Sequence, residues 1–159
     1  MPIKINKRMT GLNNLIDNTR KNSQKKIKRE IKGLVIKSIS KGISPVEKGG
    51  TDATSGKARY EPYSDSYKKQ IKNMSGKSER PVNLKVSGRL HRSLKARLTR
   101  KGVSLWFADK KAKYHDIEGA GKAKVIRRML PRDGEQFSRT IRERIIDIVD
   151  NALKKAAKR

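Results

Sequence analysis

Two histidines and a scatter of carboxylates are the side chains of this sequence best suited to chemistry. His115 is followed by Asp116 and Glu118, a group that in principle offers a general base or a set of metal ligands. The chain has no cysteine, and no second ligand set stands at a spacing that would complete a metal shell. We therefore expect His115 to be an ordinary surface or interface histidine, and we expect no catalytic residue, no metal site and no cofactor.

Two glycine-containing turns invite comparison with phosphate-binding loops. They are Gly49–Thr51 and Gly119–Lys122, and neither has the glycine-lysine-hydroxyl order that places backbone amides and a lysine around a nucleotide. A nuclease would need grouped carboxylates for Mg²⁺, whereas the acids of residues 103–159 are scattered along helical faces. The sequence thus predicts a protein that is not an enzyme.

Positive charge is the strongest signal in the composition. The 159 residues hold 42 Lys and Arg against 15 Asp and Glu, a net charge of +27. Residues 1–48 carry 13 basic against 3 acidic side chains, residues 49–102 carry 14 against 4, and residues 103–159 carry 15 against 8. A compact chain with this charge repels itself, so a nearby polyanion or an acidic protein surface would stabilise it. A composition that only favours solubility is the competing explanation.

The few aromatic residues limit the kind of nucleic-acid contact that the sequence predicts. They are not arranged as a stacking platform on alternating strand positions. The sequence instead favours sequence-independent contact with the phosphate backbone, or simple proximity to packaged DNA. A solvated basic loop is an equally good interpretation of the segment that holds the candidate DNA-facing residues, which are Lys122, Lys124, Arg127, Arg128 and Arg132.

The length and the hydrophobic content predict the overall organisation. A chain of 159 residues is close to the usual size of one domain, so we expect a single domain over residues 1–159. Hydrophobic residues make up 33% of the chain, enough for a modest core, and some segments are expected to order only against a partner. No apolar run approaches the roughly 20 residues of a membrane span, so we expect a soluble compartment and no membrane contact.

The first part of the chain predicts a long helix followed by a long loop. Apolar residues recur at helical spacing over residues 10–40. Residues 41–63 are rich in Gly, Pro, Ser and Thr, a composition typical of loops. A loop of this length suggests a role in assembly, and we expect its Tyr60 and Tyr63 to contact a neighbouring subunit.

The middle of the chain predicts a small antiparallel sheet. Residues 82–108 begin with an alternating stretch, Val82–Val86, which predicts a short strand or an extended lead, and continue with a one- to two-turn helix and a β-hairpin. The alternation in the hairpin directs Trp106 away from the core, where it is a candidate for the subunit interface. Residues 109–117 predict a short helix that carries a further candidate, Tyr114.

Residues 133–158 predict a C-terminal amphipathic helix, with Asp133 and Glu135 in its first turn and basic residues in its last. The expected fold class is therefore α+β. Long N-terminal and C-terminal amphipathic helices pack on a small antiparallel sheet with a β-hairpin, and long loops connect them.

Several motifs occur in a fixed order around the predicted hairpin. They are Ser87-Gly88-Arg89-Leu90-x-x-Ser93-Leu94, Trp106-Phe107 at the end of the hairpin, Ala112-x-Tyr114-His115-x-x-Glu118-Gly119, and Arg127-Arg128-x-Leu130-Pro131 before the last helix. In this order, which runs from about residue 81 to residue 137, the chain resembles the tail-completion and virion-morphogenesis proteins of tailed bacteriophages, found in the neck or among the minor tail proteins.

The resemblance implies an α+β subunit without catalytic activity, which forms a ring between head and tail with DNA passing through it. The implied partners are copies of the chain in a homo-oligomeric ring, the portal or connector and tail proteins of the phage, and packaged DNA by nonspecific contact. The implied location is the neck or tail of the virion, after synthesis in the host bacterial cytoplasm. The alternative is a sequence-nonspecific nucleic-acid-binding protein, for which a net charge of +27 is also typical.

Overall fold

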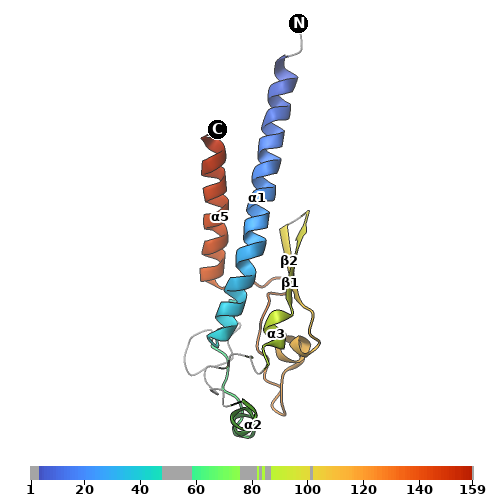
Figure 1. Ribbon diagram of the computed structural model, residues 1–159, viewed down its shortest axis with the longest axis vertical. Coiled ribbons are helices and arrows are strands. Elements are labelled where there is room, and N and C mark those ends of the chain that lie inside the picture. Colours follow the sequence, from blue (N-terminus) through green and yellow to red (C-terminus); the bar gives the residue numbers. More distant parts are fainter. Residues whose placement is uncertain are drawn as a thin grey trace.

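A computed structural model of the chain describes residues 4–47, 59–75, 82, 84, 87–100 and 102–158, with the side chains of residues 4–13, 74 and 75 left out. The fold is α+β, as the sequence predicts, with two long helices and one two-stranded antiparallel sheet (Figure 1). The elements in chain order are α1 (Lys4–Ser40), α2 (Asp65–Ser75), α3 (Arg89–Arg92), β1 (Leu94–Thr99), β2 (Gly102–Phe107), α4 (Lys111–Lys113), the π-helix η1 (Tyr114–Glu118) and α5 (Arg139–Ala157).

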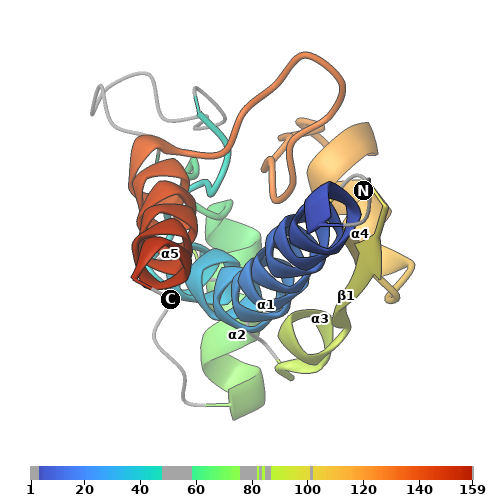
Figure 2. The same cartoon turned by 90° about the horizontal axis from the view of Figure 1, so that it is seen from above.

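Helix α1 is the central layer of the molecule. Seen along its axis it lies between α5 on one side and the hairpin on the other (Figure 2). Ile31, Val35 and Ile39 follow one another at intervals of four residues, so they form one stripe, and all three are buried. The helix begins at Lys4, six residues before the start that the sequence predicts, and ends at Ser40 before Gly42, whose φ of 70° does not fit a helix.

Helix α5 runs antiparallel to α1 and packs along its middle (Figure 1). Ile141 and Ile148 are buried, and Arg144 on α5 pairs with Glu30 on α1 at 2.7 Å. The helix begins at Arg139, so the expectation that the acids at 133 and 135 form its first turn is wrong. The carboxylate of Glu135 accepts the backbone N–H of Arg132 at 2.8 Å instead, which uses this acid in the turn before the helix.

The hairpin is confirmed, together with its inward and outward faces. Strands β1 and β2 pair antiparallel, with Leu98 opposite Val103 and Leu94 opposite Phe107. Val103 and Phe107 are partly buried against the core, and Leu94 is completely buried. Trp106 lies on the opposite face of β2 and is exposed. Because side chains alternate along a strand, this register keeps the tryptophan out of the core.

The structure describes two residues of the strand expected at 82–86, and neither of them lies in a strand. Val82 and Leu84 are buried but belong to no strand, and Leu84 has a φ of 52°, which is incompatible with an extended strand. The Leu84 backbone N–H donates to the Tyr63 hydroxyl at 3.1 Å, so a side chain replaces the pairing that a neighbouring strand would supply. Residues 83, 85 and 86 lie outside the described part of the chain.

The segment expected to be an assembly loop is described at its two ends, residues 41–47 and 59–63. These ends carry isolated bridges, from Ile43 to Arg59 and from Val46 to Phe137, and contain no helix or strand. Residues 48–58 lie outside the described ranges, and an assembly role for the loop stays a prediction. None of the helices in the described ranges has the length and apolar content needed to cross a bilayer.

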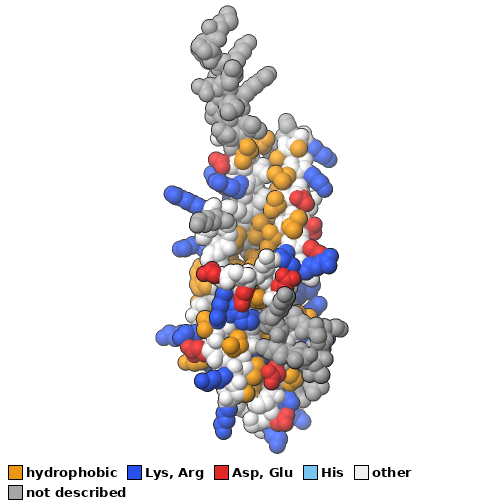
Figure 3. Space-filling model, turned by 180° about the vertical axis from the view of Figure 1, so that it is seen from behind, with side chains coloured by type: hydrophobic (Ala, Val, Ile, Leu, Met, Phe, Trp, Pro, Cys, Tyr) orange, Lys and Arg blue, Asp and Glu red, His pale blue; other side chains and the backbone are white. Residues whose placement is uncertain are grey.

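Basic side chains are spread over the length of the molecule rather than gathered at one end. Figure 3 shows Lys and Arg on the helical part and on the part that holds the sheet, with a band of hydrophobic side chains between the two long helices. This agrees with the even distribution of basic residues along the sequence.

Candidate functional site

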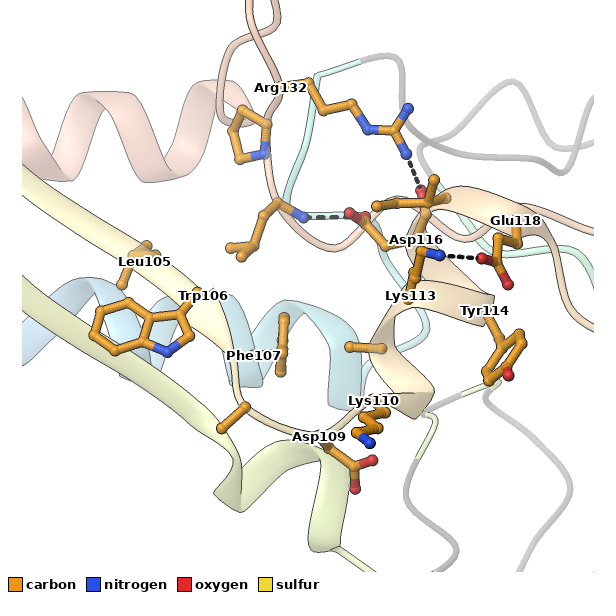
Figure 4. Close-up of a pocket in the computed structure, with 15 residues that line it drawn as sticks. Leu105, Trp106, Phe107, Asp109, Lys110, Lys113, Tyr114, Asp116, Glu118 and Arg132 are labelled. Atoms are coloured by element: carbon orange, nitrogen blue, oxygen red, sulfur yellow. Dashed lines mark hydrogen bonds and ion pairs between the residues drawn. The ribbon is translucent and has the colours of Figure 1, made fainter.

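An open pocket of about 580 Å³ lies where the end of β2 meets α4, η1 and residues 130–132 (Figure 4). Trp106 and Phe107 contribute from β2, and Tyr114 and Ile117 contribute from η1. Three of these side chains are strongly exposed for their type: Trp106 at 42%, Tyr114 at 56% and Ile117 at 46%. Large apolar groups that remain exposed around a concavity are typical of surfaces that bind another protein.

Two of the four expected interface residues, Trp106 and Tyr114, therefore line one pocket. The alternation along β2 turns Trp106 outward, and the turn from α4 into η1 brings Tyr114 to the same concavity, although the two residues come from different elements. The exposure of Ile117 was not predicted from the sequence. The sequence signal for this exposure was the position of Ile117 three residues after Tyr114, in the short helix expected at residues 109–117.

The three carboxylates around this pocket are all held by other groups of the protein. Asp109 pairs with Arg89 at 3.3 Å and accepts the backbone N–H at position 111 at 3.0 Å. Glu118 pairs with Lys113 at 2.5 Å. Among the described residues there is no group of three or more His, Asp or Glu side chains placed to hold a metal ion. The acids of this pocket therefore have structural roles.

Asp116 connects the π-helix to the chain that follows it. Its carboxylate accepts the backbone N–H of Met129 at 2.5 Å, and its backbone carbonyl accepts from the guanidinium groups of Arg128 at 2.8 Å and Arg132 at 3.0 Å. Arg128 also pairs with Glu135. These bonds fix the position of the π-helix, and with it the position of the exposed tyrosine at its start.

Arg127 and Arg128, expected to face DNA, instead turn into the protein. Arg127 is only 4% exposed, and its guanidinium donates to the backbone carbonyls of Glu61 at 3.1 Å and Pro62 at 3.4 Å. The same group lies over the Tyr63 ring, 5.4 Å from its centroid. Burial lowers the pKa of Arg127 from its ordinary value, an effect that its neighbours Tyr63 and Glu61 oppose. The DNA-facing expectation for both residues is corrected to a structural role.

Tyr60 and Tyr63, expected at a subunit interface, lie in the core. Tyr60 is almost fully buried and its hydroxyl donates to the backbone carbonyl of Arg128 at 2.9 Å, which also accepts from the Ser44 hydroxyl at 2.9 Å. Burial is the main cause of a raised pKa at both tyrosines. Neither ring is available to a neighbouring subunit, because each fills space between the loop ends and residues 127–129.

His115 is also more buried than the sequence predicts. Its Nδ1 atom is inaccessible to solvent and has no hydrogen-bond partner among the described residues. Burial, followed by the charges of Arg127 and Lys111, lowers the pKa of His115 to about 4. The histidine is therefore neutral at pH 7; it is half-buried rather than an exposed surface residue, and the alternative expectation of an interface histidine stays a prediction.

The remaining DNA-facing candidates, Lys122, Lys124 and Arg132, have exposed side chains. Both lysines lie in a turn closed by the bridge from Ala120 to Val125. Gly119 precedes this turn with a φ of 84°, and a Cβ at that position would stand 2.1 Å from the Lys124 carbonyl oxygen. The close approach requires glycine, so the exposed lysines are presented by a tightly specified turn.

A second open pocket, of about 570 Å³, lies between the middle of α1 and the C-terminal half of α5. Its apolar lining includes Ile16 and Ile27 on α1 and Val149 and Leu153 on α5. We call this pocket the helix groove, and Figure 3 shows it as the hydrophobic band between the two helices. The structure leaves both Val149 and Leu153 exposed.

Comparison of the chain with protein-family models, with curated proteins and with solved structures found no match. Its function is therefore inferred from its own side chains and from the order of its motifs.

Proposed function

We propose that this chain is a structural subunit of the neck or tail-completion region of a tailed-phage particle, where it forms a ring that joins head to tail around the path of the DNA. It acts by contact, without catalysis, and its location is the virion. Its partners are other copies of the chain, the portal or connector and tail proteins, and packaged DNA by nonspecific contact.

The observation that carries this proposal is the presence of two separate exposed apolar surfaces on one chain. The first is the pocket beside Trp106 and Tyr114, which we call the aromatic pocket and which is built from β2, α4 and η1. The second is the helix groove, built from α1 and α5. A ring subunit uses heterologous contacts and must also touch the proteins above or below the ring, so it needs more than one such surface. The motif order around the hairpin also supports the phage assignment, and several of the motif residues line the first of these surfaces.

The positive charge is compatible with a position around DNA. Lys122, Lys124 and Arg132 are exposed, and a chain with a net charge of +27 gains from nearby phosphates. Contacts of this kind are independent of base sequence, as a lumen that conducts any part of a genome requires.

The experiment that tests the proposal is the mass of the purified protein in solution, with and without duplex DNA, at low and at moderate salt. Sedimentation velocity should show a discrete oligomer without DNA, and moderate salt should leave it intact. A monomer that coats duplex DNA and is released steeply by added salt would contradict the proposal, because salt suppresses counterion release in a dedicated binder.

A sequence-nonspecific nucleic-acid-binding protein is the second candidate. The observation that favours it is the same charge of +27 together with the exposed lysines of the turn before Val125. This candidate gives no role to the exposed Trp106 and Tyr114, which is why we prefer the ring subunit.

A further inference from the structure

The exposed side of α5 carries an apolar stripe that no described part of the chain covers. Ile146, Val149 and Leu153 recur at intervals of three and four residues, so they share one face of the helix. Ile146 is 57% exposed and Leu153 is 56% exposed. This face adjoins the buried one, which holds Ile141 and Ile148 against α1. Val149 and Leu153 of this stripe line the helix groove on its α5 side.

The outer edge of this stripe carries three acids and one lysine, Lys154, which is unusual in so basic a chain. Glu143, Asp147 and Asp150 stand at intervals of four and three residues and hold three of the 15 acids of the sequence. Glu143 pairs with Arg139 at 2.6 Å. Asp147 and Asp150 form no ion pair with any described residue. We call these three residues the acidic edge.

The opposite edge of the groove, on α1, is basic. Arg20 lines the groove and pairs with Asp17 at 3.3 Å. Lys21 and Lys28 lie seven residues apart on the side of α1 that continues beyond Arg20, and neither forms an ion pair within the described part of the chain. In Figure 3 the α1 side of the hydrophobic band carries mostly blue side chains, and the α5 side carries red side chains together with blue ones. We call Arg20, Lys21 and Lys28 the basic edge.

We propose that a second copy of this chain covers the helix groove, with its basic edge against the acidic edge of the first copy. The exposed α5 stripe of the first copy is then buried, and Asp147 and Asp150 gain cationic partners that the described part of their own chain does not supply. This inference rests on the proposed function only in that both require self-association. It assigns the groove to the contact between copies and leaves the aromatic pocket for a different protein.

The charge pattern also selects how the copies can be arranged. When α1 of one copy lies on α5 of the next, unlike edges meet and each pair of charges is attractive. When α1 lies on α1, Lys21 and Lys28 meet their own counterparts, and like charges at contact are unfavourable. An acidic helix from another protein would fit the basic edge, but it would meet Asp147 and Asp150 with like charge. Successive copies give each edge a partner of opposite charge.

The test uses charge reversal at the two edges of the full-length protein. The double variants are D147K/D150K, which makes the α5 edge basic, and K21E/K28E, which makes the α1 edge acidic. A matched control is K69E/K72E on the exposed surface of α2, which changes the net charge by the same amount as K21E/K28E. Each lysine-to-glutamate change removes two charges, so both variants have +27 − 4 = +23. Circular dichroism confirms that each variant is folded.

Sedimentation velocity at about 0.15 M salt should show that each edge variant self-associates at least tenfold more weakly than the wild type. An equimolar mixture of D147K/D150K and K21E/K28E should associate again, because the basic edges of one variant then face the acidic edges of the other. The control K69E/K72E should associate as well as the wild type or better. Leu153→Asp should also dissociate the copies, by placing a charge in the apolar stripe.

Two results would overturn the inference, and they are distinguishable. If the wild type forms an oligomer that K21E/K28E leaves intact, the copies meet through another surface and the ring proposal survives. If the wild type is a monomer at every concentration and salt, both this contact and the proposed ring are wrong.

Discussion

Replacement of Arg127 tests whether the basic loop is a DNA-binding element or part of the structural core. Truncation to alanine removes the donor to two backbone carbonyls, at positions 61 and 62, and the cation over the Tyr63 ring. The hydrogen bond at 3.1 Å is made by a charged donor and is worth about 1.5–3 kcal/mol, and the cation–π contact adds roughly 0.5–2 kcal/mol. The variant no longer has to bury a charged guanidinium, and this removed cost offsets part of the loss.

We therefore expect Arg127→Ala to lower the free energy of unfolding by about 3 kcal/mol, with a fall in Tm of about 6–12 °C for a chain of this size. Urea unfolding followed by Trp106 fluorescence measures the change. Lys122→Ala is the control, because that side chain is exposed in the turn before Val125, and it should change stability by less than about 0.5 kcal/mol. Arg127→Lys keeps the charge but loses the planar fork and should fall between the two.

The reasoning would be refuted if Arg127→Ala were as stable as the wild type. It would also be refuted if the variant were stable but bound duplex DNA less tightly than Lys122→Ala. Either result would mean that the guanidinium does not hold residues 61 and 62 in solution.

Two further predictions concern pH and the backbone. The pKa of His115 in the folded protein, about 4, lies below its ordinary value of 6.5, so the unfolded chain binds the proton more tightly between these values. The free energy of unfolding should fall by up to about 3 kcal/mol as the pH drops from 6.5 to 4, and urea unfolding of His115→Leu at pH 7 and 4.5 should show a weaker dependence. Gly119→Ala should lose at least about 2 kcal/mol more than Gly134→Ala in thermal unfolding. Both glycines have a positive φ, but only the first would press a Cβ against backbone; equal losses would contradict this.

The elements with strong periodicity could be predicted from the sequence. The α1 stripe, the hairpin with its outward Trp106 and the C-terminal helix follow from spacings of four residues and of two, which are local properties. Tyr114 was also placed correctly on an exposed short helix. These features need no knowledge of what lies elsewhere in the chain.

The residues that were placed wrongly depend on contacts between distant parts of the sequence. Arg127 is buried because its donors meet carbonyls 65 and 66 residues earlier in the chain, and Tyr60 is buried because its hydroxyl meets a carbonyl 68 residues later. Composition near these residues is typical of exposed loops, so local rules place them at the surface. The exposed stripe of α5 had a local signal, since the adjacent isoleucines at 145 and 146 widen the apolar arc beyond what one neighbouring helix covers.

The length of α1 has a consequence for the order in which parts of the protein become rigid. The helix extends past the end of α5, so its first turns lack that neighbour, whereas its last turns are enclosed between α5 and the hairpin (Figures 1 and 2). Backbone amide protons near Ile31 and Ile39 should exchange with solvent only on global unfolding, and protection should decline steadily toward the N-terminus. The core can thus be folded while the leading end of the same helix still exchanges freely, which leaves that end to become rigid when a neighbour arrives.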